Sequence, residues 1–126
     1  MKGALPVCAD FLAKVGKKPA SLQFVECKKV VAYGLAALES SYRVNGAHAA
    51  ASEAYLVKIA QIPRLRFICC GWDSYPLKPG PRERYGDLHM DGYPYEISMS
   101  SGETLEKRWA AIPFFHVRVT VYLEEP

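Results

Sequence analysis

Alternating hydrophobic and polar positions predict five strands along this chain. The clearest pattern lies near the C-terminus, where every second residue from Phe115 to Leu123 is hydrophobic. Weaker alternation occurs at four earlier places. The predicted strands cover residues 22–31, 38–44, 65–72, 93–99 and 115–123. A sheet is therefore expected to form the centre of the molecule.

Helical spacing of hydrophobic residues predicts two main helices. The first runs from Pro6 to Val15, because proline suits the first helical position and Gly16 suits the residue after the end. The second is an alanine-rich segment over residues 47–61, stopped by Pro63. A short third helix over 100–109 is predicted from a capping box of Ser100 and Glu103.

This order of elements predicts a single α+β domain over residues 1–126. We expect a mostly antiparallel five-stranded sheet, with two main helices packed on one face and the short third helix beside them. Four cysteines should cross-link this fold through disulfide bonds.

The position of the cysteines suggests how they pair. Neighbouring strand residues point to opposite faces of a sheet, so Cys69 and Cys70 are expected to bond two different partners. Those partners can only be Cys8 and Cys27. Two alternatives carry less weight: four reduced thiols in a cytosolic protein, and a reactive Cys69–Cys70 pair. A reactive pair is disfavoured because Cys69 alternates with core-facing Leu65 and Phe67.

An even number of cysteines in a small chain also predicts an oxidising compartment, either the periplasm or the cell exterior. The first residues lack the apolar stretch of a secretory signal, so we expect a mature form with an added Met1. No run reaches the ~20 apolar residues of a membrane span. The net charge of +3 comes from scattered residues, so a nucleic-acid partner is not expected.

A long irregular connection over residues 73–92 is the strongest candidate for binding. Tyrosine, tryptophan and arginine dominate the energetics of protein interfaces. The candidate contacts are Trp72, Tyr75, Arg82, Arg84 and Tyr85. The alternative is a solvated hairpin extension whose tyrosines fold back on the domain.

Signals for catalysis are weaker. Asp87, His89 and Asp91 could hold a metal ion on one side of an extended segment, but three ligands within five residues suit a polar turn better. No nucleophile elbow, zinc-protease motif or phosphate-binding loop occurs. We therefore expect neither an enzyme nor a bound cofactor.

Several short segments resemble a known family. They are Cys8-x-Asp10-Phe11-Leu12, Leu22-x-Phe24-x-x-Cys27, Tyr42-Arg43-Val44-x-Gly46, Tyr55-Leu56-Val57-Lys58, Cys69-Cys70-Gly71-Trp72, Ile97-Ser98-Met99-Ser100-Ser101 and Val121-Tyr122-Leu123. Together they resemble a family of small exported Gram-negative proteins of unknown function. The resemblance implies a periplasmic protein with a cysteine framework and no known catalytic residue.

Small proteins of this type also resemble the immunity partners of antibacterial toxins delivered between cells, as in type VI secretion. The leading hypothesis is therefore a periplasmic immunity protein that occludes a secreted toxin. The alternative is a protein that binds a small ligand or envelope component in an apolar pocket. That pocket would be lined by Tyr42, Tyr55, Tyr95 and Met99.

Overall fold

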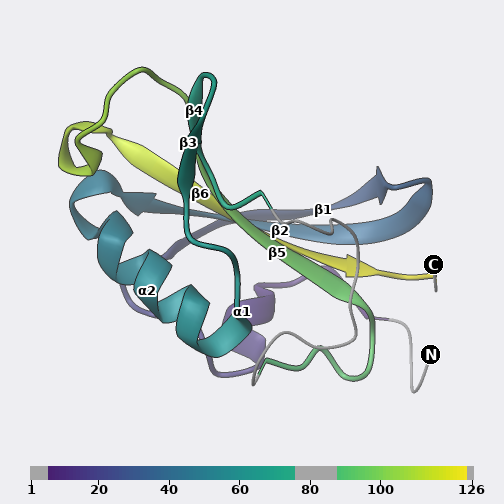
Figure 1. Cartoon of the computed structure of the whole chain (residues 1–126). Coiled ribbons are helices and arrows are strands. Elements are labelled where there is room, and N and C mark those ends of the chain that lie inside the picture. Colours follow the sequence, from purple (N-terminus) through teal and green to yellow (C-terminus); the bar gives the residue numbers. More distant parts are fainter. Residues whose placement is uncertain (1–5, 76–87, 125–126) are drawn as a thin grey trace.

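The computed structural model describes residues 6–75 and 88–124, and its centre is a six-stranded antiparallel sheet (Figure 1). The strand order is β1-β2-β6-β5-β4-β3. The elements are α1 (Phe11–Lys14), β1 (Gln23–Ala32), β2 (Leu35–Asn45), η1 (Gly46–His48), α2 (Ala49–Ala60), β3 (Arg66–Ile68), β4 (Gly71–Asp73), β5 (Tyr95–Glu103), η2 (Trp109–Ala111) and β6 (Phe114–Tyr122), where η marks a 3-10 turn. The predicted five-stranded sheet with two main helices is therefore wrong, since the structure has six strands and one main helix.

The sixth strand arises because the predicted strand over 65–72 is in fact a hairpin. β3 and β4 pair with each other, and Ile68 lies opposite Gly71. Cys69 and Cys70 form the turn between them, with Cys69 in the left-handed region at φ 55°. Neither residue is a glycine or an asparagine, the usual markers of such a turn, so the sequence carried no turn signal. In Figure 1 this hairpin runs steeply across the longer strands.

Two of the predicted helices also change. The first is a single turn from Phe11 to Lys14. Asp10 caps its N-terminal end, because the Asp10 carboxylate accepts a hydrogen bond from the Ala13 N–H at 3.0 Å. The helix predicted over 100–109 does not form, because β5 continues to Glu103 and pairs with β4. Ser100 is thus a strand residue, not a helix cap. Trp109–Ala111 form only a 3-10 turn.

The main helix, α2, agrees with the prediction over 47–61 to within two residues. The helical segment follows Asn45, whose side chain accepts a hydrogen bond from the Ala47 N–H. It ends at Gln61, which adopts a left-handed conformation at φ 52°. The buried Glu53 then accepts a hydrogen bond from the Leu65 N–H at 2.7 Å, which fixes the path from α2 into β3.

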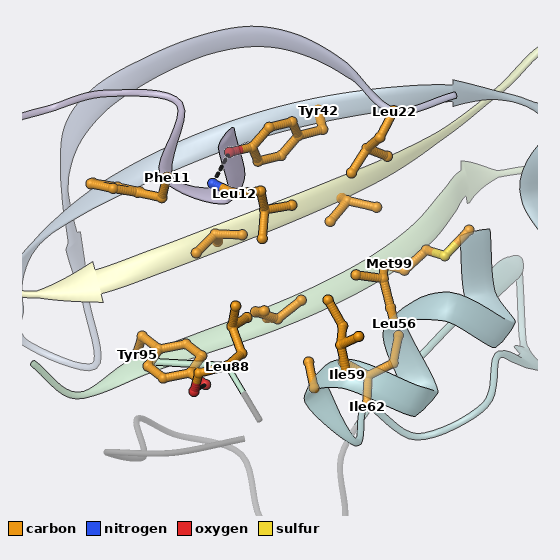
Figure 2. Packing of buried hydrophobic residues seen from close by; sticks show 14 of the residues in the cluster. Phe11, Leu12, Leu22, Tyr42, Leu56, Ile59, Ile62, Leu88, Tyr95 and Met99 are labelled. Carbon is orange, nitrogen blue, oxygen red and sulfur yellow. Dashed lines mark hydrogen bonds between the residues drawn. The ribbon is translucent and has the colours of Figure 1, made fainter. Parts of the chain in front are cut away.

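The hydrophobic core lies between the helices and one face of the sheet (Figure 2). Phe11 and Leu12 of α1 and Leu56 of α2 are all buried there. The strands contribute alternate residues, which makes this their covered face. These strand residues are Leu38, Tyr42, Val44, Tyr95, Ile97, Met99, Phe115, Val117, Val119 and Val121. No helix within residues 6–75 and 88–124 is both long and apolar enough to cross a membrane.

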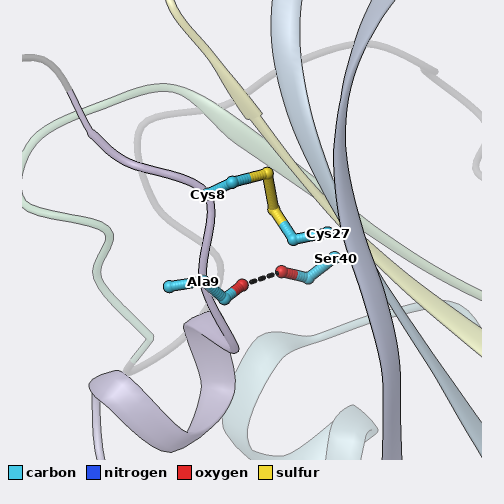
Figure 3. Close-up of a disulfide and its surroundings, with 4 residues drawn as sticks. All are labelled: Cys8, Ala9, Cys27 and Ser40. Atoms are coloured by element: carbon cyan, nitrogen blue, oxygen red, sulfur yellow. Dashed lines mark hydrogen bonds between the residues drawn. A yellow bond between two sulfur atoms is a disulfide. The ribbon is translucent and has the colours of Figure 1, made fainter.

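All four cysteines lie in disulfides, as predicted, but the pairing differs. Cys8 bonds Cys27, with a Cα–Cα distance of 5.5 Å (Figure 3), and Cys69 bonds Cys70. The predicted cross-pairing of Cys8 and Cys27 with Cys69 and Cys70 is wrong because the latter two occupy a turn rather than opposite faces of a strand. The Cys8–Cys27 bond ties the segment before α1 to β1. Beside it, the Ser40 hydroxyl donates a hydrogen bond to the Ala9 carbonyl.

Candidate functional site

The second face of the sheet, here called the open face, carries polar and charged side chains. In the described ranges, α1 and α2 both lie on the opposite side (Figure 1). Strand alternation and register assign the residues of the open face. They are Glu39, Ser41 and Arg43 in β2, Phe114, His116, Arg118 and Thr120 in β6, and Glu96, Ser98 and Ser100 in β5.

A cleft of about 400 Å³ lies where the β3–β4 hairpin meets β5, and we call it the hairpin cleft. Its lining combines aromatic, apolar and acidic groups. The lining residues are Ile68, Cys70, Gly71, Trp72, Asp73, Tyr75, Ser100, Gly102 and Glu103. Gly71 permits the close approach of the two strands, because a Cβ atom there would lie 2.2 Å from the Gly102 carbonyl oxygen.

A second exposed tyrosine, Tyr33, lies within electrostatic range of Tyr75, which lines this cleft. Tyr75 follows β4 and is 55% exposed, and Tyr33 lies in the β1–β2 turn and is 60% exposed. Partial burial raises the pKa of Tyr33, and the negative charge of Glu96, the proximity of Tyr75 and a hydrogen bond to Glu96 raise it further. The β1–β2 turn therefore brings Tyr33 to Glu96 of the open face, within electrostatic range of Tyr75.

The predicted binding residues divide into three groups. Tyr75 lines the hairpin cleft and is exposed, as a contact residue should be. Trp72 also lines the cleft, but its ring packs edge-on against Phe67 and Trp109, and its indole N–H donates to the Glu106 carbonyl at 3.0 Å. Trp72 thus supports the wall of the cleft. Arg82, Arg84 and Tyr85 lie outside the described residues, as does most of the predicted connection over 73–92.

The sequence interpretation did not single out Tyr33. Its local signal was Gly34, which lies between two predicted strands and is the residue type that most readily adopts the positive φ of a tight turn. Tyr33 and Gly34 both have positive φ values, 51° and 74°. This signal could have predicted the turn, but not the approach to Tyr75, which is distant in sequence.

A row of four polar side chains crosses the open face in register: Arg43, His116, Ser100 and Asp73. Partial loss of water contact lowers the pKa of His116, and the nearby Arg118 and Arg43 lower it further. Burial raises the pKa of Asp73, although Arg118, Arg66 and the Ser74 N–H act in the opposite direction.

This row does not match a hydrolytic relay. In a serine hydrolase the histidine lies between the nucleophile and the acid, so that it can accept the hydroxyl proton while the acid orients it. Here Ser100 pairs with His116 on one side and with Asp73 on the other, so the serine takes the middle position. The row suits polar contact with a bound molecule better than proton transfer to His116.

The other candidate sites have different surroundings. Of the proposed metal ligands, His89 and Asp91 are exposed and Asp87 lies outside the described residues. Within the ranges 6–75 and 88–124, three or more metal-ligating side chains gather nowhere. The residues of the proposed apolar pocket lie mainly in the packed core, where Tyr42, Tyr95 and Met99 are fully buried (Figure 2). The Tyr55 hydroxyl donates to the Lys17 carbonyl at 2.7 Å.

Comparison with known proteins gives a family and no described activity. Neither a curated protein nor a solved structure matches the chain significantly. One family model matches residues 2–72, which include α1, β1, β2, α2 and the β3–β4 turn. Because this match covers more than half of the sequence, the chain belongs to the family described as a domain of unknown function, DUF4952.

Proposed function

We propose that this protein is a non-catalytic binding protein that holds a protein partner on its open face, at the hairpin cleft. The observation that carries the proposal is the hairpin cleft, which is lined by exposed Tyr75 together with apolar and acidic groups, and exposed Tyr33 lies within electrostatic range of Tyr75. Tyrosine supplies a large contact area with few rotatable bonds, so it loses little entropy on binding.

Arginine side chains of the sheet and of β3 also suit a protein interface. Arg118 lies 3.8 Å from Glu39, and its guanidinium side chain is 54% exposed. Arg66 donates a hydrogen bond to the Tyr75 carbonyl at 3.1 Å, which holds the backbone that presents this tyrosine. Arginine and aromatic residues are enriched at interfaces, and mixed charge at the rim favours one orientation of the partner.

The scaffold behind the open face is suited to presenting these groups. The covered face packs against both helices, and the Cys8–Cys27 bond fastens the N-terminal segment to β1. A surface that is already ordered loses less conformational entropy on association. Tyr33 and Tyr75 lie in connecting segments, but these segments are attached to an ordered sheet.

For the partner and compartment we propose a secreted antibacterial toxin that is neutralised by occlusion in the periplasm. This part rests on the resemblance to immunity proteins and on the oxidised cysteines, which are typical of exported proteins. Arg82, Arg84 and Tyr85 remain predicted contacts with the partner.

The binding test uses the oxidised protein as bait for envelope and secreted proteins of its native strain. A captured partner is then purified, and its affinity is measured by calorimetry. Replacing Tyr33 or Tyr75 by alanine should weaken binding at least about tenfold, as expected for a central aromatic contact. Val31→Ala is the matched control, because Val31 is 78% exposed in the same hairpin but its register places it on the other side of the sheet.

Equal affinities for wild type, Tyr33→Ala and Tyr75→Ala would exclude the open face as the binding surface. The toxin part has its own test in cells. Deletion of the gene should make cells sensitive to sister cells, and wild type should restore resistance while Tyr75→Ala does not. A deletion strain that competes normally would exclude the immunity role but leave the binding surface to be judged by calorimetry.

A further inference from the structure

We propose that the Cys69–Cys70 disulfide is a reversible redox site whose state sets the shape of the hairpin cleft. The inference goes beyond the proposed binding function and needs no partner for its test. It starts from the different surroundings of the two disulfides. Cys69 and Cys70 are both exposed at the tip of the β3–β4 hairpin, while Cys8 and Cys27 are partly buried against the core.

The two bonds also differ in what they can do for the fold. Cys8 and Cys27 are 19 residues apart, so their bond restricts the unfolded chain considerably. Cys69 and Cys70 are adjacent, so their bond closes a ring with no further residue in it. Its effect on the unfolded chain is small, and its main effect is on the local backbone of the turn.

That backbone connects directly to the cleft. The Cys70 N–H donates to the Ile68 carbonyl at 2.6 Å, and the Cys70 carbonyl accepts from the Thr104 N–H at 2.8 Å. Cys70 itself lines the cleft, together with Ile68 on β3 and Gly102 and Glu103 on β5. A change of backbone conformation at the turn therefore reaches both walls of the cleft.

The left-handed conformation of Cys69, at φ 55°, favours a change of backbone conformation in the turn when the disulfide is broken. This region is unfavourable for a residue with a Cβ atom. The bond to Cys70 restricts both residues while it is intact. Once it is broken, Cys69 is free to adopt a more favourable backbone conformation, and the Cys70 carbonyl moves with it.

The reaction is thiol–disulfide exchange with a dithiol. A thiolate of the dithiol attacks one sulfur of the pair, the Cys69–Cys70 bond breaks, and a mixed disulfide forms. The second thiol of the reagent then attacks the reagent sulfur of the mixed disulfide, which breaks the bond to the protein and closes the reagent's own disulfide. Two protonated cysteines and one oxidised dithiol result, so two electrons pass from the dithiol to the protein.

The test treats the oxidised full chain with dithiothreitol, blocks free thiols with N-ethylmaleimide at set times, and maps the labels by mass spectrometry. Labels should appear at Cys69 and Cys70 at least about tenfold faster than at Cys8 and Cys27, because an exposed disulfide is more accessible to attack. Oxidised glutathione should then restore the bond. Labelling of Cys8 and Cys27 at an equal or higher rate, or a failure to reoxidise, would overturn the redox site.

The effect on the cleft is measured by NMR on the same samples. Reduction should shift the amide resonances of Gly71 and Thr104, while those of β2 stay unchanged. Cys69→Ser/Cys70→Ser should give the spectrum of the reduced form and should not respond to dithiothreitol. Reduction that leaves Gly71 and Thr104 unshifted would overturn the coupling to the cleft. None of these results bears on the tyrosine test of partner binding, so the two proposals fail separately.

Discussion

Tyr42 is the residue that joins α1 to the sheet. Its hydroxyl accepts a hydrogen bond from the Leu12 N–H at 3.0 Å (Figure 2) and donates one to the Asp10 carboxylate at 2.8 Å. Burial raises the pKa of Tyr42, so the hydroxyl stays protonated and able to donate. One side chain of β2 therefore holds both the cap and the first turn of the helix.

Tyr42→Phe should lower the free energy of unfolding by about 1–3 kcal/mol, because the buried Leu12 N–H would lose its partner. Urea denaturation followed by circular dichroism measures the change. Tyr55→Phe is the matched control, since that hydroxyl makes an exposed hydrogen bond and its loss should cost less. Equal losses for the two variants would contradict the role given to Tyr42.

The Asp10 carboxylate should make the stability of the fold depend on pH. Burial opposes its ionisation, but Lys18, at 2.9 Å, the Ala13 N–H and the Tyr42 hydroxyl together hold its pKa below the ordinary value of 3.8. Because the pKa of Asp10 is lower in the folded state than in the unfolded chain, its charge stabilises the fold at pH values above the unfolded-state pKa. The contribution is then lost as the pH falls through the folded value.

Asp10→Asn should therefore be less stable than wild type at neutral pH, and the difference should shrink as the pH falls below about 4. Denaturation curves at pH 7, 5, 4 and 3 measure it. A difference that stays constant over this series would show that the charge of Asp10 does not contribute.

At the scale of elements, the segment between α2 and β3 depends on one buried carboxylate. Glu53 is 7% exposed, accepts from the Leu65 N–H and lies 3.4 Å from the Arg64 guanidinium. This contact turns the chain from the end of the helix toward the hairpin that forms the cleft. The position of the cleft therefore depends partly on a side chain outside it.

Glu53→Ala should lower the free energy of unfolding by about 1–3 kcal/mol, because it leaves the Leu65 N–H without its acceptor. Glu26→Ala is a suitable control, because Glu26 is exposed on β1 and its removal should change stability by less than about 0.5 kcal/mol. Thermal or urea unfolding distinguishes the two. A Glu53→Ala protein as stable as Glu26→Ala would contradict this assignment.

Sequence patterns predicted the long elements and missed the short ones for identifiable reasons. The alternation from Phe115 to Leu123 predicted β6 to within one residue, because one face of that strand is fully buried. The turn at Cys69–Cys70 stayed hidden because it contains no glycine or asparagine. Ser100 and Glu103 have the spacing of a helix cap, but pairing with β4 decides their conformation. Local propensity does not encode such long-range pairing.

The candidate site was predictable only in part for the same reason. Tyr75 was selected by its residue type and its place after an apolar run. Tyr33 comes from a hairpin more than 40 residues earlier, and it lies within electrostatic range of Tyr75 only in the folded sheet. The predicted disulfide pairing was wrong because it assumed that Cys69 and Cys70 lie in one strand.

For the whole molecule, the Cys8–Cys27 bond should be the main covalent contribution to stability. Cys8→Ser/Cys27→Ser should lower the free energy of unfolding by about 2–4 kcal/mol, because the unfolded chain regains the freedom of a 19-residue separation. Cys69→Ser/Cys70→Ser should cost about 1 kcal/mol or less on the same entropic argument. Urea denaturation of both double variants measures these values, and a larger loss for the second would contradict the division of roles.

The division of the sheet into a covered face and an open face has a consequence for how such a protein changes over generations. Strand residues of the open face alternate with core residues but point the other way, so their replacement should leave the packing intact. Substitutions on the open face are therefore compatible with an unchanged architecture.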